Sequence, residues 1–147
     1  MHAGHDTHPA IQRSAPGLNE RAFLRADAFI LRNLGRNFTL ADVAAAACIS
    51  RFHFARQFRQ RVGCSPMAYV MRLRLERAKE MLARGDQRIA DTAAALGFYD
   101  QSHFTRTFRR ATGVSPRAFS HECRHAGTTG ATRILRLSDT AQANAHP

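Results

Sequence analysis

Carboxylates, lysine and long apolar runs are all scarce in this sequence. Only 11 Asp and Glu stand against 22 Lys and Arg, which gives a formal net charge of +11, and Lys79 is the one lysine. No segment approaches the roughly 18 consecutive apolar residues of a membrane span, so we expect none. The segment Met1–Gln12 lacks the basic and the apolar region of a secretory signal, so we expect no signal peptide.

Recognisable catalytic and metal-binding patterns are also missing. There is no glycine-rich phosphate loop, no HxE motif with CxxC and no paired-carboxylate motif, so we expect no enzyme. Histidine and cysteine gather near both ends without a complete four-ligand spacing, so we expect no metal and no cofactor. Metal sensing by these clusters is an alternative. The clusters are His2, His5 and His8, and His121, Cys123 and His125.

The three cysteines, Cys48, Cys64 and Cys123, are an odd number without a CxxC spacing. This pattern argues against a disulfide framework and fits a reducing cytosol. A redox sensor at Cys48 or Cys64 is an alternative, although Cys64 aligns with the apolar Val114 in an internal repeat, which indicates a core position.

Arginine supplies nearly all of the positive charge. Its planar guanidinium offers five donors that match phosphate and the edge of guanine. A balance this basic favours an anionic partner, either a nucleic acid or an acidic membrane surface. A general bias of the composition toward arginine and alanine is the alternative explanation.

Apolar residues recur with helical spacing from about residue 18 to residue 124, and strand-like alternation is absent. The pattern predicts an all-α domain of about seven helices, with breaks at Gly35, Gly63, Gly85 and Gly113. The apolar face expected for the first helix consists of Phe23, Leu24, Ala28, Leu31 and Leu34.

An internal repeat is the most informative feature. From His53 to Pro66, eight of fourteen positions are identical to the positions fifty residues later, at His103 to Pro116. Alanine-rich segments before the two copies also match, with an offset of forty-nine, so the second turn is one residue longer. Each copy has the pattern of a short helix, a tight turn and a second helix, which is the layout of a helix-turn-helix unit.

The repeat divides the chain into five expected parts. They are a disordered arm over residues 1–17, a first helix-turn-helix subdomain over 18–64, a linker helix over 65–85, a second helix-turn-helix subdomain over 86–124 and a disordered tail over 125–147. We expect disorder at both ends because they are rich in small and polar residues and show no helical period.

The second helix of each copy has an apolar and a basic side. Phe54 and Phe58, like their counterparts in the second copy, fall on the side expected to face the core. The stretches 50–61 and 103–117 each hold four arginines and no acid. A helix with such a face fits a DNA major groove, although a basic face that is only solvated is the alternative.

The position of each side chain around its helix predicts its role. Arg56 and Arg106 lie farthest from the core and are the candidates for contacts to base edges. Gln101 and Ser102 lie in the first turn of their helix, where recognition helices touch bases. Phe52 is a candidate for packing on the methyl group of thymine, and covering of the neighbouring core is the alternative. The expected contacts to the DNA backbone, or secondary contacts, are His53, Arg59, His103, Arg109 and Arg110. For the two histidines, capping or packing is the alternative.

These motifs resemble the AraC/XylS family of transcription regulators over about residues 22–123. The resemblance is carried by Gly97-Phe98, Ser102-His103-Phe104, Arg106, Phe108-Arg109, Gly113, Ser115-Pro116 and Phe119, and by the linker segment Met71–Ala78. It implies two lobes whose recognition helices enter adjacent major grooves on one face of DNA. It also implies base-reading positions at Phe52, Ala55, Arg56, Gln101, Ser102 and Arg106. Cys48 departs from the family, which usually has glycine in the first turn, and a left-handed residue other than glycine costs about 1 kcal/mol there.

We therefore expect a sequence-specific DNA-binding transcription regulator that binds an asymmetric promoter site on double-stranded DNA as a monomer. The two groove segments should be centred about 34 Å, or 10 bp, apart. RNA polymerase is an expected second partner, and the expected location is the bacterial cytoplasm, at the nucleoid. The length leaves no room for a separate ligand-binding domain, so the resemblance is to stand-alone members. The alternative is a basic protein that binds the nucleoid or RNA without sequence preference.

Overall fold

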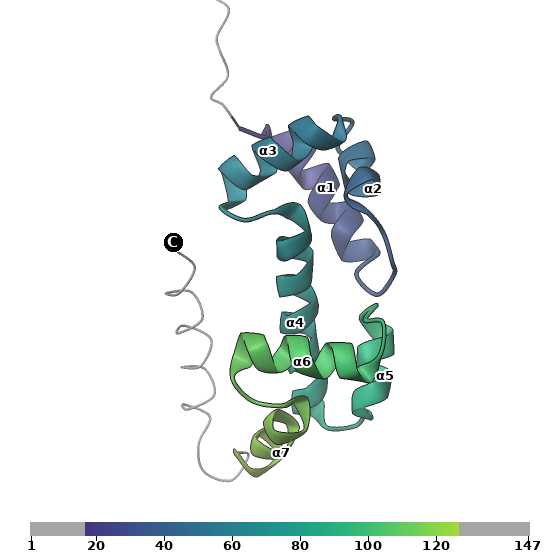
Figure 1. Cartoon of the computed structure of the whole chain (residues 1–147), viewed down its shortest axis with the longest axis vertical. Helices are drawn as coiled ribbons and strands as arrows, with labels where there is room; N and C mark the ends of the chain where they lie inside the picture. Colours follow the sequence, from purple (N-terminus) through teal and green to yellow (C-terminus); the bar gives the residue numbers. More distant parts are fainter. Residues whose placement is uncertain (1–16, 127–147) are drawn as a thin grey trace, which may run out of the picture.

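The computed structural model describes residues 17–126, and helices make up all of its regular secondary structure (Figure 1). In chain order they are α1 (Glu20–Arg32), α2 (Leu40–Ala46), α3 (Arg51–Val62), α4 (Pro66–Arg84), α5 (Ile89–Ala95), α6 (Gln101–Thr112) and α7 (Pro116–Ala126). The expected all-α fold of about seven helices is confirmed for this part of the chain. The arm and tail expected over residues 1–17 and 125–147 lie almost wholly outside it, except that α7 continues to Ala126.

Polar side chains at the N-caps fix where the helices begin. At α2 the Thr39 amide donates to Asp42 Oδ2 at 2.7 Å, and the Asp42 amide donates to Thr39 Oγ1 at 3.3 Å. The bond from the Thr39 amide lowers the pKa of the Asp42 carboxyl. At α6 the His103 amide donates to Asp100 Oδ1 at 2.6 Å. Each bond satisfies an amide that the start of a helix leaves without a partner.

The apolar face predicted for the first helix is wrong in part. Leu24 and Leu31 are each 54% exposed, whereas Ala22, Ala26 and Ile30 are buried. The prediction followed the larger apolar side chains. Ala28, also predicted for the apolar face, is exposed, whereas Ala22 and Ala26 face inward and let α1 lie close against α2.

Two hydrophobic cores lie near opposite ends of α4, one among α1–α3 and the other among α5–α7 (Figure 1). In the first core the rings of Phe54 and Phe58 are fully buried, with centroids 5.4 Å apart. In the second core the rings of Phe104 and Phe108 are also fully buried, and their centroids are 5.6 Å apart. Burial of each ring contributes about 1.5–3 kcal/mol, so the repeated phenylalanines anchor both cores.

The linker helix α4 belongs to both cores. Val70 packs in the first core, whereas Leu75, Ala78 and Leu82 pack in the second. With 19 residues the helix is about 28 Å long, so it spaces the two cores rigidly. None of the helices within residues 17–126, α4 included, combines the length and the apolar character that a membrane crossing requires.

Candidate nucleic-acid interface

Two helix-turn-helix units, α2–α3 and α5–α6, form the candidate interface. In the first turn Cys48 has a φ of +59°, and in the second Gly97 has a φ of +71°. Both residues therefore take the left-handed conformation in which glycine is favoured. The prediction that Cys48 stands in the glycine position of the first turn is confirmed, and the side chain there is exposed.

The outer face of α3 carries the residues predicted from the first copy. Phe52 is 79% exposed, and His53, Arg56 and Arg59 are exposed as well. Ala55 is half-buried at the flank of the helix. The structure thus brings these side chains onto one surface, on the side of α3 opposite the buried phenylalanines.

The outer face of α6 carries the residues predicted from the second copy. Five of these six residues are exposed: Gln101, Ser102, Arg106, Arg109 and Arg110. His103 is half-buried, and its ring meets the ring of Phe98 edge-on at 5.5 Å. Its Nδ1 atom is buried without a hydrogen-bond partner among the described residues. The surroundings of His103 therefore favour the packing role over a contact with DNA.

The arginines of these two faces have no carboxylate partner within residues 17–126. The ion pairs found there are Arg61–Glu20, Arg77–Glu80, Lys79–Glu76 and Arg88–Asp91. Arg61, at the end of α3, also donates to the carbonyl oxygen of Leu18 at 3.0 Å. Arg56, Arg59, Arg106, Arg109 and Arg110 are in none of these pairs. Their guanidiniums are free to bind an anion from outside the described part of the chain.

Two aromatic or basic residues beside the helix starts were missed by the sequence reasoning. Tyr99, directly before the N-cap of α6, is 92% exposed. Tyr99 is the extra residue of the second turn, and this difference between the two copies was the signal in the sequence that could have singled it out. The guanidinium of Arg51 lies 4.8 Å from the centroid of the Phe52 ring, so it adds a charge beside that exposed aromatic residue.

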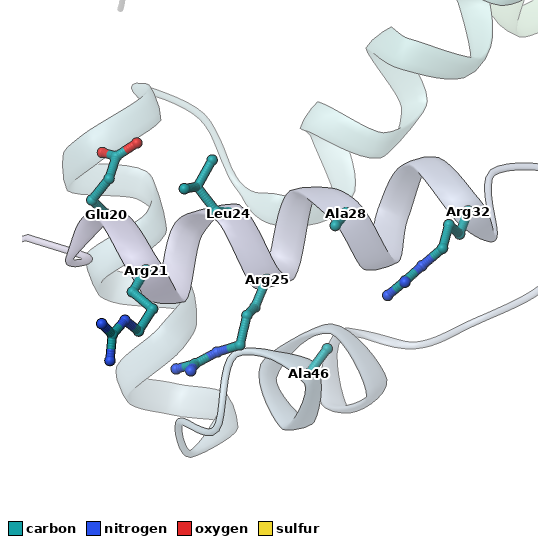
Figure 2. A pocket seen from close by; sticks show the side chains of 7 residues that line it. All are labelled: Glu20, Arg21, Leu24, Arg25, Ala28, Arg32 and Ala46. Atoms are coloured by element: carbon teal, nitrogen blue, oxygen red, sulfur yellow. The ribbon is translucent and has the colours of Figure 1, made fainter.

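Two open grooves lie beside the units. One, of about 460 Å³, is lined by Gln101 at the start of α6 and by Arg88, Arg117 and Arg124 among others. The other, of about 730 Å³, follows α1, where Arg21, Arg25 and Arg32 extend toward the side on which Ala46 of α2 lies (Figure 2). Only the first groove includes a residue predicted to read bases.

Known proteins match this chain over the same region. Residues 43–122, more than half of the chain, match the family described as Helix-turn-helix domain. An AraC-like transcription regulator from Streptomyces lividans is 33% identical over 86 residues, which cover 58% of this chain and 28% of that protein. The lactose operon transcription activator from Staphylococcus xylosus is 32% identical over 72 residues, which cover 49% of this chain and 26% of that protein. The chain thus spans about a quarter of the length of these curated relatives.

Solved structures share the fold. The DNA-binding domain of AdpA, a global transcriptional factor, in complex with a target DNA has a TM-score of 0.70 and 28% identity, covering 76% of this chain and 100% of that one. A regulator with an AraC-type DNA-binding domain from Chromobacterium violaceum has a TM-score of 0.65 and 27% identity. The match covers 69% of this chain and 91% of that one. The chain therefore contains an AraC-type DNA-binding domain and belongs to the AraC-type helix-turn-helix family of transcription regulators.

Proposed function

We propose that this chain is a sequence-specific regulator that binds double-stranded DNA as a monomer and reads two adjacent major-groove segments. One observation carries the proposal: α3 and α6 each expose arginines that have no carboxylate partner within residues 17–126. Such guanidiniums can donate to phosphates and to the edge of guanine. The likeness to a domain crystallised with a target DNA supports the same partner.

Base reading is proposed for the start and the middle of each recognition helix. Arg56 and Arg106 can each donate two hydrogen bonds to guanine, which gives about 1–3 kcal/mol of discrimination. Gln101 and Ser102 are exposed in the first turn of α6, where a recognition helix meets bases. Phe52 offers an exposed apolar surface that suits the methyl group of thymine.

Contacts with the DNA backbone are proposed for the remaining exposed arginines. Arg59, Arg109 and Arg110 lie farther along their helices and can donate to phosphates, which fixes register without reading sequence. His53 is exposed and can add a secondary contact. Ala55 occupies a proposed reading position but has no polar group, so the first unit should select fewer bases than the second.

The proposed site is asymmetric because the two reading faces differ. The repeat is direct, so one monomer presents two unlike faces in the same orientation. A single chain then needs no second copy to bind both groove segments. At a promoter in the bacterial cytoplasm, RNA polymerase would be the second partner of such a complex.

Selection of bound sites from random duplex DNA tests the proposal. We expect an asymmetric site with two groups of preferred bases centred about 10 bp apart. Binding of scrambled duplexes as tightly as the selected site would overturn the proposal and favour a protein that binds nucleic acid without sequence preference.

A pair of variants of equal charge separates reading from general attraction. Arg106→Ala removes a proposed reading residue, and Arg77→Ala removes an arginine on α4 that pairs with Glu80. Each variant has one positive charge fewer, so non-specific attraction should fall by a similar small amount. We expect only Arg106→Ala to change which sites are selected.

A further inference from the structure

The loop between α1 and α2 reaches from the first helix-turn-helix unit to the second. This loop covers residues 33–39. At Gly35 an added Cβ would overlap the backbone carbonyl oxygen of Ala95, the last residue of α5. The two backbones therefore touch directly, and the sequence needs glycine at position 35 because no side-chain atom fits between them.

Arg74, on α4, binds both sides of this contact. Its Nε atom donates to the carbonyl oxygen of Leu34 at 2.9 Å, and its Nη2 atom donates to that of Arg36 at 2.7 Å. Its Nη1 atom donates at 3.3 Å to the carbonyl oxygen of Gly97, in the turn of the second unit. One guanidinium thus ties the α1–α2 loop of the first unit to the α5–α6 turn of the second.

The site is closely built around this side chain. Arg74 is only 8% exposed, and the ring of Phe38 lies 5.7 Å from the centre of its guanidinium. A Cβ on Gly97 would lie 3.0 Å from Arg74 Nη2 and 3.2 Å from the carbonyl oxygen of Gly35. Burial lowers the pKa of the Arg74 guanidinium, and no ion pair found within residues 17–126 includes it.

Arg74 is buried without a carboxylate partner among residues 17–126, so the desolvation cost of its charge is offset only by hydrogen bonds to carbonyl oxygens. Its planar fork of donors does fix the positions of the groups that it binds. Those groups belong to the two units that carry α3 and α6. Apart from α4 itself, they form a second connection between the units.

We propose that Arg74 is a positioning residue: with Gly35 and Gly97 it forms a latch that fixes the angle between α3 and α6 and so sets the spacing of the two DNA half-sites. The fixed angle is a property of the free protein. The consequence for half-site spacing rests on the function proposed above. Loss of the latch should leave the core of each unit intact and change only how firmly the two units are held relative to each other.

The free protein gives the first test. Residual dipolar couplings of backbone amides report the relative orientation of the two units in solution. We expect one alignment tensor to describe both units in the native protein and in Arg77→Met, which removes an exposed arginine of the same helix. In Arg74→Met we expect each unit to need its own alignment tensor, with different magnitudes. The amide chemical shifts of residues inside each core should stay unchanged. A single shared tensor in Arg74→Met would overturn the proposal.

Gly35→Ala provides an independent variant in case Arg74→Met does not fold. The added methyl group pushes the loop away from Ala95 and leaves Arg74 in place. In Gly35→Ala we again expect a different alignment tensor for each unit. A single tensor shared by both units in this variant would also contradict the proposal.

DNA binding gives the second test, with a readout that general destabilisation would not move. One base pair is inserted between the halves of the selected site. We expect the native protein and Arg77→Met to lose at least about tenfold in affinity, and Arg74→Met to lose no more than about threefold. Equal losses in all three proteins would contradict the role in spacing. If no site is selected at all, the proposed function fails, while the dipolar couplings still decide whether the latch exists.

Discussion

Arg106 lies in the exposed middle of α6, between Gln101 and Arg109 along the helix. We predict that Arg106→Ala relaxes the preference at one base pair and loses about 1–3 kcal/mol on the selected site. Competitive binding against duplexes that carry each of the four base pairs at each position measures this effect. An equal loss on every duplex would show that Arg106 binds the backbone.

Arg109 is predicted to act on phosphate. Arg109→Ala should weaken binding to all duplexes by a similar factor and reduce the slope of log affinity against log salt by about one unit. A salt titration on the selected and on a scrambled duplex measures the slope. An unchanged slope, or a loss confined to one base pair, would rule out this role.

Cys48 is the one residue other than glycine with a positive φ among residues 17–126. We predict that Cys48→Gly raises the free energy of unfolding by about 1 kcal/mol, because glycine adopts this conformation without strain. Chemical denaturation followed by circular dichroism checks the change. Unchanged or lower stability would mean that the turn is not strained.

The contrast between Cys48 and Arg74 marks how far residues can be predicted from the sequence. Cys48 aligns with Gly97 in the repeat, so its left-handed turn could be predicted by local comparison. Helical spacing places Arg74 on the same face of α4 as the buried Val70, Ala78 and Leu82, but its sequence neighbours do not indicate what it binds. Its partners are carbonyl oxygens from residues 34, 36 and 97, which only the folded chain brings to one point.

At the scale of single helices, the N-caps allow a matched comparison. Asp100 accepts a bond from the His103 amide, whereas Ser50, at the N-cap of α3, makes no side-chain capping bond. We predict that Asp100→Ala lowers the free energy of unfolding by about 1 kcal/mol and that Ser50→Ala changes it much less. Denaturation curves of the two variants decide this, and equal losses would argue against capping by Asp100.

Capping residues and glycines indicate where the helices begin and end, but the sequence of α1 does not indicate which of its faces is buried. Thr39, Ser65 and Asp100 each precede a helix and bond to one of its first amides, so these starts could be predicted. In α1, alanines and larger apolar residues are spread around the helix. Which of them are buried depends on how closely α2 packs against α1, and that distance cannot be predicted from the sequence of α1 alone.

For the whole molecule, the repeat predicts two similar units but not their relative orientation. The identical positions of the two copies include buried phenylalanines and exposed arginines of each second helix and the turn that follows it, and none of them lies in the contact between the units. The contact between the units is made by the α1–α2 loop, whose touching residue Gly35 was assigned only a helix-ending role from the sequence. Spacing between the recognition helices is therefore a property that only the structure supplies.

Methylation interference on the selected duplex probes most directly whether two arginine-lined helices engage one DNA molecule together. Methyl groups on guanine N7 block contacts in the major groove and leave the minor groove unaffected. We expect two clusters of interfering guanines on one face of the duplex, centred about 10 bp apart. In the Arg106→Ala variant we expect one of those guanines to lose its effect. One cluster alone, or interference spread evenly along the duplex, would contradict the account.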